Sequence, residues 1–78
     1  MREEIIRLIE QQLDIDYLDV QLDGNHGTLL VVSEQFAGLS SVKRQQKVYA
    51  CLGDKIASGE LHAVNIRALT PDQWEGAE

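Results

Sequence analysis

The chain has 78 residues, with 7 Lys and Arg against 13 Asp and Glu, so its formal net charge is −6. Its hydrophobic fraction of 44% and charged fraction of 26% are typical of soluble globular domains, which argues against a disordered chain and against a membrane protein. This length predicts a single domain over residues 1–78. It also leaves little interior for a substrate cavity, which argues against an enzyme with a large pocket.

Cysteine usage and the N-terminal segment bear on the compartment. The one cysteine, Cys51, cannot form a disulfide within the chain, whereas secreted domains of this size usually need several, so we expect a reducing, cytoplasmic compartment. No stretch approaches the roughly 20 apolar residues that cross a bilayer. Residues 1–10 are acidic, unlike the basic start of a signal segment, so no membrane association is expected.

The first half of the chain predicts a helix and a hairpin. Apolar residues recur at helical spacing over residues 2–13, namely Ile5, Ile6, Ile9 and Leu13. Apolar and polar side chains then alternate over residues 17–22, which predicts a strand with one solvated face. The turn formers at 24–27 and the apolar run at 28–33 predict a hairpin whose second strand is central in the sheet and whose first strand is an edge.

The second half predicts a long helix, a strand and a short helix. Ser40 or Ser41 can cap a helix that ends near Gly59. Its apolar positions at the 3.6-residue period are Val42, Val48, Tyr49, Leu52 and Ile56. Alternation over residues 62–69 predicts the third strand, and residues 70–74 predict a terminal helix anchored by Trp74, which we expect to close the core.

The order helix, strand, strand, helix, strand, helix predicts an α+β fold. The hairpin makes the first two strands antiparallel, and the helical crossover makes the second and third parallel. We therefore expect a three-stranded mixed sheet with helices packed on one face.

Few residues have the pattern of a catalytic or metal site. Cys51 lies on the predicted buried side of the long helix, where a thiol is unreactive, and no serine is part of a nucleophile motif. We therefore expect no enzymatic activity. His26 lies in the predicted hairpin loop and His62 begins the third strand. Two imidazoles leave a four-coordinate metal half empty, so a metal site here would be completed by another molecule. Alternatively, His26 is solvated and His62, which shares the parity of Val64, points toward the core.

Charge is unevenly distributed along the chain. Residues 40–55 hold four basic side chains against one acidic, on an otherwise acidic body. Lys43, Arg44 and Lys47 therefore form a basic patch at the start of the long helix, suited to an acidic partner or to phosphates, or simply solvated.

Three blocks of this sequence resemble the BolA family: residues 36–49 (FAGLSSVKRQQKVY), residues 59–66 (GELHAVNI) and residues 70–74 (TPDQW). The N-terminal helix and the hairpin fit the same family, so the resemblance covers essentially the whole chain. Many BolA proteins carry an Arg-His pair where this chain has Arg44-Gln45. The Gln45-Gln46 version resembles a bacterial subgroup, which argues against transferring the founding member's proposed role in gene regulation.

The resemblance implies a fold similar to a class II KH domain. It also implies a protein that partners a monothiol glutaredoxin and shares with it a glutathione-ligated [2Fe-2S] cluster, in iron-sulfur trafficking or iron regulation. His62, within Leu61-His62-Ala63, corresponds to one cluster ligand of the family, and His26 in the hairpin loop corresponds to the second. One thiolate from the glutaredoxin and one from glutathione would complete the ligand set, and Lys43, Arg44 and Lys47 could help to dock the partner.

Two other functions remain open from the sequence. One is a DNA-binding regulator of a stress response that uses the KH-like fold and the basic patch, although the net charge of −6 and the lack of a glycine-rich basic loop argue against it. The other is an interaction module without metal. We expect the isolated protein to be a monomer or a weak homodimer.

Overall fold

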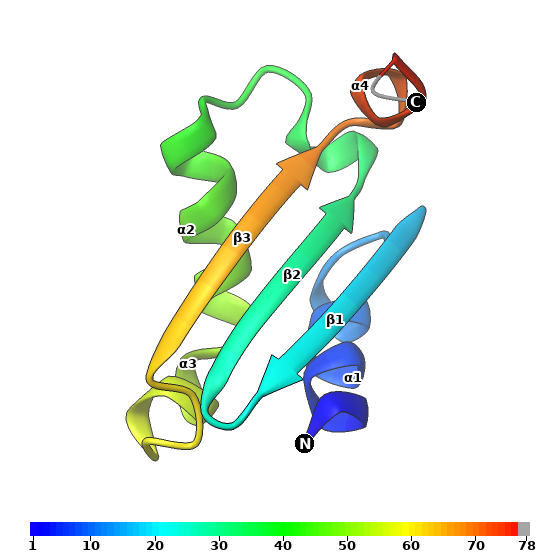
Figure 1. Cartoon of the computed structure of the whole chain (residues 1–78). Helices are drawn as coiled ribbons and strands as arrows, with labels where there is room; N and C mark the ends of the chain where they lie inside the picture. The colour runs from blue at the N-terminus through cyan, green and yellow to red at the C-terminus, as the bar shows by residue number, and fades with distance from the viewer. Residues whose placement is uncertain (77–78) are drawn as a thin grey trace.

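The three predicted strands form one sheet (Figure 1). The computed structural model describes residues 1–76. Its elements in chain order are α1 (Arg2–Gln12), β1 (Tyr17–Asp23), β2 (His26–Val32), the 3-10 helix η1 (Glu34–Phe36), α2 (Ser41–Cys51), α3 (Gly53–Ala57), β3 (Ala63–Leu69) and α4 (Pro71–Gly76). The predicted α+β class is confirmed, with η1 and α3 as additional short elements.

The sheet has the order β1-β2-β3, so β2 is central and β1 is an edge, as expected. β1 pairs antiparallel with β2, and β2 pairs parallel with β3. The register sets Asp23 opposite His26, and His26 opposite Ala63. The mixed sheet follows from the two connections, since a tight turn joins antiparallel neighbours and a helical crossover joins parallel ones.

The core lies between one face of the sheet and the helices α1 and α2, which lie behind the sheet in Figure 1. Alternation along the strands turns every second apolar residue toward these helices. Fully or almost fully buried residues of the core are Ile5, Ile9, Val20, Leu29, Val31, Phe36, Val48, Leu52 and Leu61. The opposite face of the sheet, which we call the open face, carries Asp19, Gln21, His26, Thr28 and Asn65 among others.

The prediction of one uninterrupted long helix is wrong, because the chain bends at Leu52. Leu52 has φ −103° and ψ 8°, and its N–H donates to the carbonyl of Tyr49, three residues back, at 3.0 Å. Leu52 itself is fully buried, and Gly53, a weak helix former, begins α3. Packing of Leu52 into the core thus ends α2 one turn after Val48.

The buried side of the long helix also differs from the prediction. Val42, Tyr49 and Ile56 were predicted to share the buried stripe, but 64%, 38% and 38% of their surfaces are exposed. At 3.6 residues per turn Val42 and Tyr49 lie on a different side of α2 from Val48, and Ile56 lies beyond the break, in α3. Val48, Cys51 and Leu52 form the side that packs inward.

The terminal helix differs from the prediction in its packing. Trp74 does not join the core; its ring stacks on Tyr17, with centroids 4.8 Å apart and planes inclined by 20°. Tyr17 alternates with Leu18 and Val20, so its side chain is on the open face of β1. Trp74 therefore anchors α4, as expected, but at the end of the sheet (Figure 1). No helix within residues 1–76 is long and apolar enough to cross a membrane.

Candidate functional site

His26 is the first residue of β2 and not a loop residue, which corrects the predicted start of this strand. Gly24 and Asn25 alone form the turn, and Gly24 has φ +61°, a value that two-residue hairpin turns require and glycine adopts without strain. His26 is exposed on the open face. It contributes to a shallow hollow of about 280 Å³, which is lined by Gln21, Leu22, Asp23, His26 and Thr28.

His62 lies one residue before β3 and is exposed, so the alternative in which it points into the core is wrong. The alternation of β3 does not yet govern its side chain, because the strand begins only at Ala63. Its backbone N–H donates to the carbonyl of Asn25 at 2.9 Å, and the preceding Leu61 is buried. These two contacts fix the main chain of His62 beside the hairpin turn.

The structure brings the two histidines to the same end of the sheet. β2 and β3 are parallel and both begin at this end, which is the lower end in Figure 1. His26 pairs with Ala63, the residue after His62, and the bond from His62 to Asn25 ties the two strand starts together. Within residues 1–76 no cluster of three or more His, Cys, Asp or Glu could hold a metal ion.

The basic residues lie elsewhere. Ser40 caps α2 by accepting the N–H of Lys43 at 3.3 Å, so Lys43, Arg44 and Lys47 occupy its first two turns. Arg44 reaches Ala68, near the far end of β3 from His62. The basic patch and the histidine end are therefore separated by most of the length of β3.

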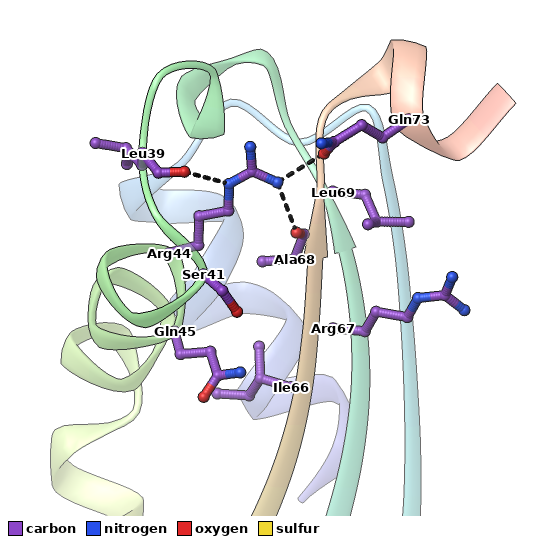
Figure 2. Close-up of a pocket in the computed structure, with 9 residues that line it drawn as sticks. All are labelled: Leu39, Ser41, Arg44, Gln45, Ile66, Arg67, Ala68, Leu69 and Gln73. Atoms are coloured by element: carbon purple, nitrogen blue, oxygen red, sulfur yellow. Dashed lines mark hydrogen bonds between the residues drawn. The ribbon is translucent and has the colours of Figure 1, made fainter. Parts of the chain in front are cut away.

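Arg44 is a structural connector between three elements (Figure 2). Its Nε donates to the carbonyl of Leu39 at 3.0 Å, and Nη1 donates to the carbonyl of Ala68 at 3.2 Å and to Oε1 of Gln73 at 2.6 Å. Arg44 lines a groove of about 470 Å³ between α2 and β3. The side chain of Arg67 points away from Arg44 (Figure 2). Lys43 and Lys47 remain exposed. Contact of any of the three with a partner stays a prediction.

The thiol of Cys51 is buried and distant in sequence from both histidines, in line with a structural cysteine. Its Sγ lies 3.4 Å from the carbonyl oxygen of Lys47, and 5% of the residue is exposed. Burial raises the pKa of the Cys51 thiol, and the nearby charge of Lys47 offsets this only in part. A thiol in this state is a poor nucleophile and a poor metal ligand at neutral pH.

Sequence reasoning missed Asn65. Its Nδ2 lies 3.1 Å from Nε2 of His26, and both side chains are exposed on the open face. The alternation over residues 62–69 places Asn65 on the polar side of its strand, but only the pairing register brings it beside a residue 39 positions away.

Comparison with known proteins identifies the family of this chain. The family model described as BolA-like protein matches residues 9–73. The chain belongs to the BolA family. It is 41% identical over 71 residues to the acid stress protein IbaG of Escherichia coli (strain K12), covering 91% of this chain and 84% of that protein.

Solved structures of BolA-like proteins have the same fold. A BolA protein homologue from Coxiella burnetii superposes with a TM-score of 0.82 at 29% identity, over 96% of both chains. A BolA-like protein from Babesia bovis superposes with a TM-score of 0.90 at 22% identity, over 99% of this chain and 92% of that one, and shows likeness of fold alone. The described helices and strands of this BolA-family chain are thus those of the family fold.

Proposed function

We propose that this BolA-family protein is a non-enzymatic adaptor. It binds a monothiol glutaredoxin and shares with it a glutathione-ligated [2Fe-2S] cluster, acting in iron-sulfur trafficking or iron regulation. The observation that carries the proposal is the placement of His26 and His62 at one end of the sheet, both exposed and joined through the Asn25 carbonyl.

The donor set fits a shared site. Two imidazoles provide half of the four ligands that a [2Fe-2S] cluster requires, and residues 1–76 hold no cluster of candidate ligands that would complete them. A glutaredoxin thiolate and a glutathione thiolate would supply the remainder. Histidine in place of cysteine raises the reduction potential of such a cluster, so the shared form would be easier to reduce than an all-thiolate one.

The DNA-binding alternative has less support. Of the three basic side chains at the start of α2, Arg44 already donates three hydrogen bonds within the protein. In this patch Lys43 and Lys47 remain for phosphate contacts, on a chain of net charge −6. Affinity for nucleic acid rests on several phosphate contacts at once. We therefore retain the adaptor function alone.

Titration of a glutathione-ligated [2Fe-2S] glutaredoxin tests the proposal by visible absorption and circular dichroism. We expect the wild type to change the cluster spectrum up to a one-to-one ratio. His62→Ala and His26→Ala should each weaken or abolish the change, because each removes one cluster ligand. Gln12→Ala, which alters an exposed carboxamide at the end of α1, should behave as the wild type. A spectrum left untouched by the wild type would refute the proposal for that partner.

A further inference from the structure

His26 lies on the face of the sheet opposite to the helices. Gly27 and Leu29, which have the other parity on β2, are buried, so the side chain of His26 is on the open face. Asn65, whose neighbours on β3 pack against the core, is on the same face, and its Nδ2 lies 3.1 Å from Nε2 of His26. α1 and α2 lie behind the sheet (Figure 1). A cluster therefore reaches this ring from the open face and not from the side of the helices.

His62 lies at the end of the same surface. The residue is exposed, and its N–H donates to the carbonyl of Asn25 in the hairpin turn at 2.9 Å. Its ring is close to the loop that follows α3, since a Cβ atom on Gly59 would lie 3.7 Å from Nε2 of His62. These contacts place the ring at the end of the sheet where β2 and β3 begin. A partner whose cluster contacts both histidines must therefore cover this end and the adjoining part of the open face.

Arg67 is the one Arg or Lys of the three strands. It is exposed and alternates with Ile66 and Ala68, which pack against the core, so its side chain is on the open face. Figure 2 shows this side chain pointing away from Arg44. None of the ion pairs within residues 1–76 includes Arg67. Its guanidinium can therefore bind a carboxylate of another molecule, and a bidentate pair of this kind is strong and specific in its geometry.

We propose that the open face is the surface on which the cluster-bearing glutaredoxin docks, with Arg67 paired to a carboxylate of that partner. The inference rests on the proposed function, because His26 and His62 fix the end of the sheet at which the partner binds. The face continues from there, since Thr28 follows His26 on the same side of β2. Leu30, two residues further, pairs with Arg67 in the register. α2 lies behind the sheet, so its basic side chains stay outside this interface (Figure 1).

Charge reversal on opposite sides of the sheet tests the docking surface. Anaerobic isothermal titration calorimetry measures the affinity of each variant for a glutathione-ligated [2Fe-2S] glutaredoxin. Arg67→Glu should weaken the complex about tenfold, because a carboxylate then faces the carboxylate of the partner. Arg7→Glu, the same substitution at an exposed position of α1, should bind within about twofold of the wild type, since salt screens a distant charge. A wild-type affinity in Arg67→Glu, or an equal loss in Lys43→Glu on α2, would overturn the inference.

Methyl resonances show which face the partner covers. Leu30 is on the open face, whereas Val42 is exposed on α2, so the two side chains are matched probes. Addition of the same glutaredoxin should shift the methyl signals of Leu30 and leave those of Val42 in place. Shifts at Val42 without shifts at Leu30 would contradict docking on the open face.

A second pair of variants separates the docking surface from the adaptor function. Thr28→Glu adds bulk and charge beside His26 and should weaken the complex, whereas Gln46→Glu, at an exposed position of α2, should not. If His26→Ala abolishes the complex while Arg67→Glu and Thr28→Glu bind as the wild type does, the docking surface is refuted and the adaptor function stands. If the wild type forms no complex, both claims fail.

Discussion

The buried thiol of Cys51 makes stability depend on pH through a single side chain. Burial favours the neutral thiol, so its pKa is higher in the folded protein than in the unfolded chain. The resulting stabilisation is complete below the unfolded pKa, about 8.5, and is lost as the pH rises through the higher folded value. A Cys51→Ala variant has no thiol and lacks this dependence of stability on pH.

We therefore expect urea-unfolding experiments to show the wild type losing more stability than Cys51→Ala between about pH 7 and pH 10. A thiol reagent at neutral pH should label Cys51 slowly in the native protein and rapidly in denaturant, because 5% of the residue is exposed. Equal labelling rates in the two states would contradict the burial of this thiol.

At the scale of elements, Arg44 holds the start of α2, the end of β3 and α4 together. Its guanidinium supplies donors to two backbone carbonyls and to Gln73. Arg44→Ala should lower the free energy of unfolding by about 1.5–3 kcal/mol, the range for hydrogen bonds that involve a charged group. Loosening of α4 should also separate Trp74 from Tyr17 and change the tryptophan fluorescence of the folded protein.

Lys43→Ala is the matched control for Arg44→Ala, since Lys43 is an exposed cation in the same turn of α2. Its loss should change stability by no more than about 0.5 kcal/mol and leave the fluorescence unaltered. Equal effects of the two substitutions would mean that charge alone, and not the hydrogen bonds of Arg44, accounts for the result.

A second link joins distant elements through Lys55. Its ammonium lies 2.6 Å from Glu4 of α1 and 2.9 Å from Glu60. The hydrogen bond and charge of Lys55 lower the pKa of Glu4. The stabilisation from Glu4 is therefore present above its unfolded pKa, about 4.3, and is lost as the pH falls through the lower folded value.

Lys55→Met should accordingly lower the melting temperature slightly at pH 7, and the difference from the wild type should shrink as the pH falls below about 4.3 and through the lowered folded pKa of Glu4. Thermal unfolding followed by far-ultraviolet circular dichroism measures both. A difference from the wild type that persists undiminished in acid would show that Lys55 acts through packing of its stem and not through its ion pairs with Glu4 and Glu60.

For the whole molecule, the core is small and each large side chain matters. Phe36 is fully buried, and its replacement by alanine costs about 3–5 kcal/mol in typical cores. A domain of this size has a total stability of about 4–12 kcal/mol. Phe36→Ala should therefore unfold at much lower urea, whereas Val42→Ala, at a position 64% exposed, should stay within about 0.5 kcal/mol of the wild type. Similar midpoints for both variants would contradict the assigned core.

The sequence predicts those parts of the fold that depend on local patterns. The alternation over residues 17–22 and 62–69, the apolar run of the central strand and the glycine turn predict the three strands, and the helical crossover predicts the parallel pair. The break at Leu52 escapes prediction because it depends on packing against the core, and the Trp74–Tyr17 stack because it joins opposite ends of the chain.

The candidate site is predicted to a similar degree. Residue type and resemblance single out His26 and His62, and the parallel strands place them at one end of the sheet. The contacts of Arg44 with Ala68 and Gln73 join positions 24 or more apart, and so does the contact of Asn65 with His26. A one-residue change of register between β2 and β3 would remove the contact between Asn65 and His26. Contacts set by register are visible only in the folded chain.

The central claim is that two histidines of this chain complete a cluster site on a glutaredoxin, and native mass spectrometry tests it most directly. A glutathione-ligated [2Fe-2S] glutaredoxin is mixed with the wild type or with the double variant His26→Ala/His62→Ala, and the species are weighed. We predict that the wild type yields a one-to-one heterodimer carrying one cluster and glutathione, and that the double variant yields none. A double variant that forms the same cluster-bearing heterodimer would contradict the account.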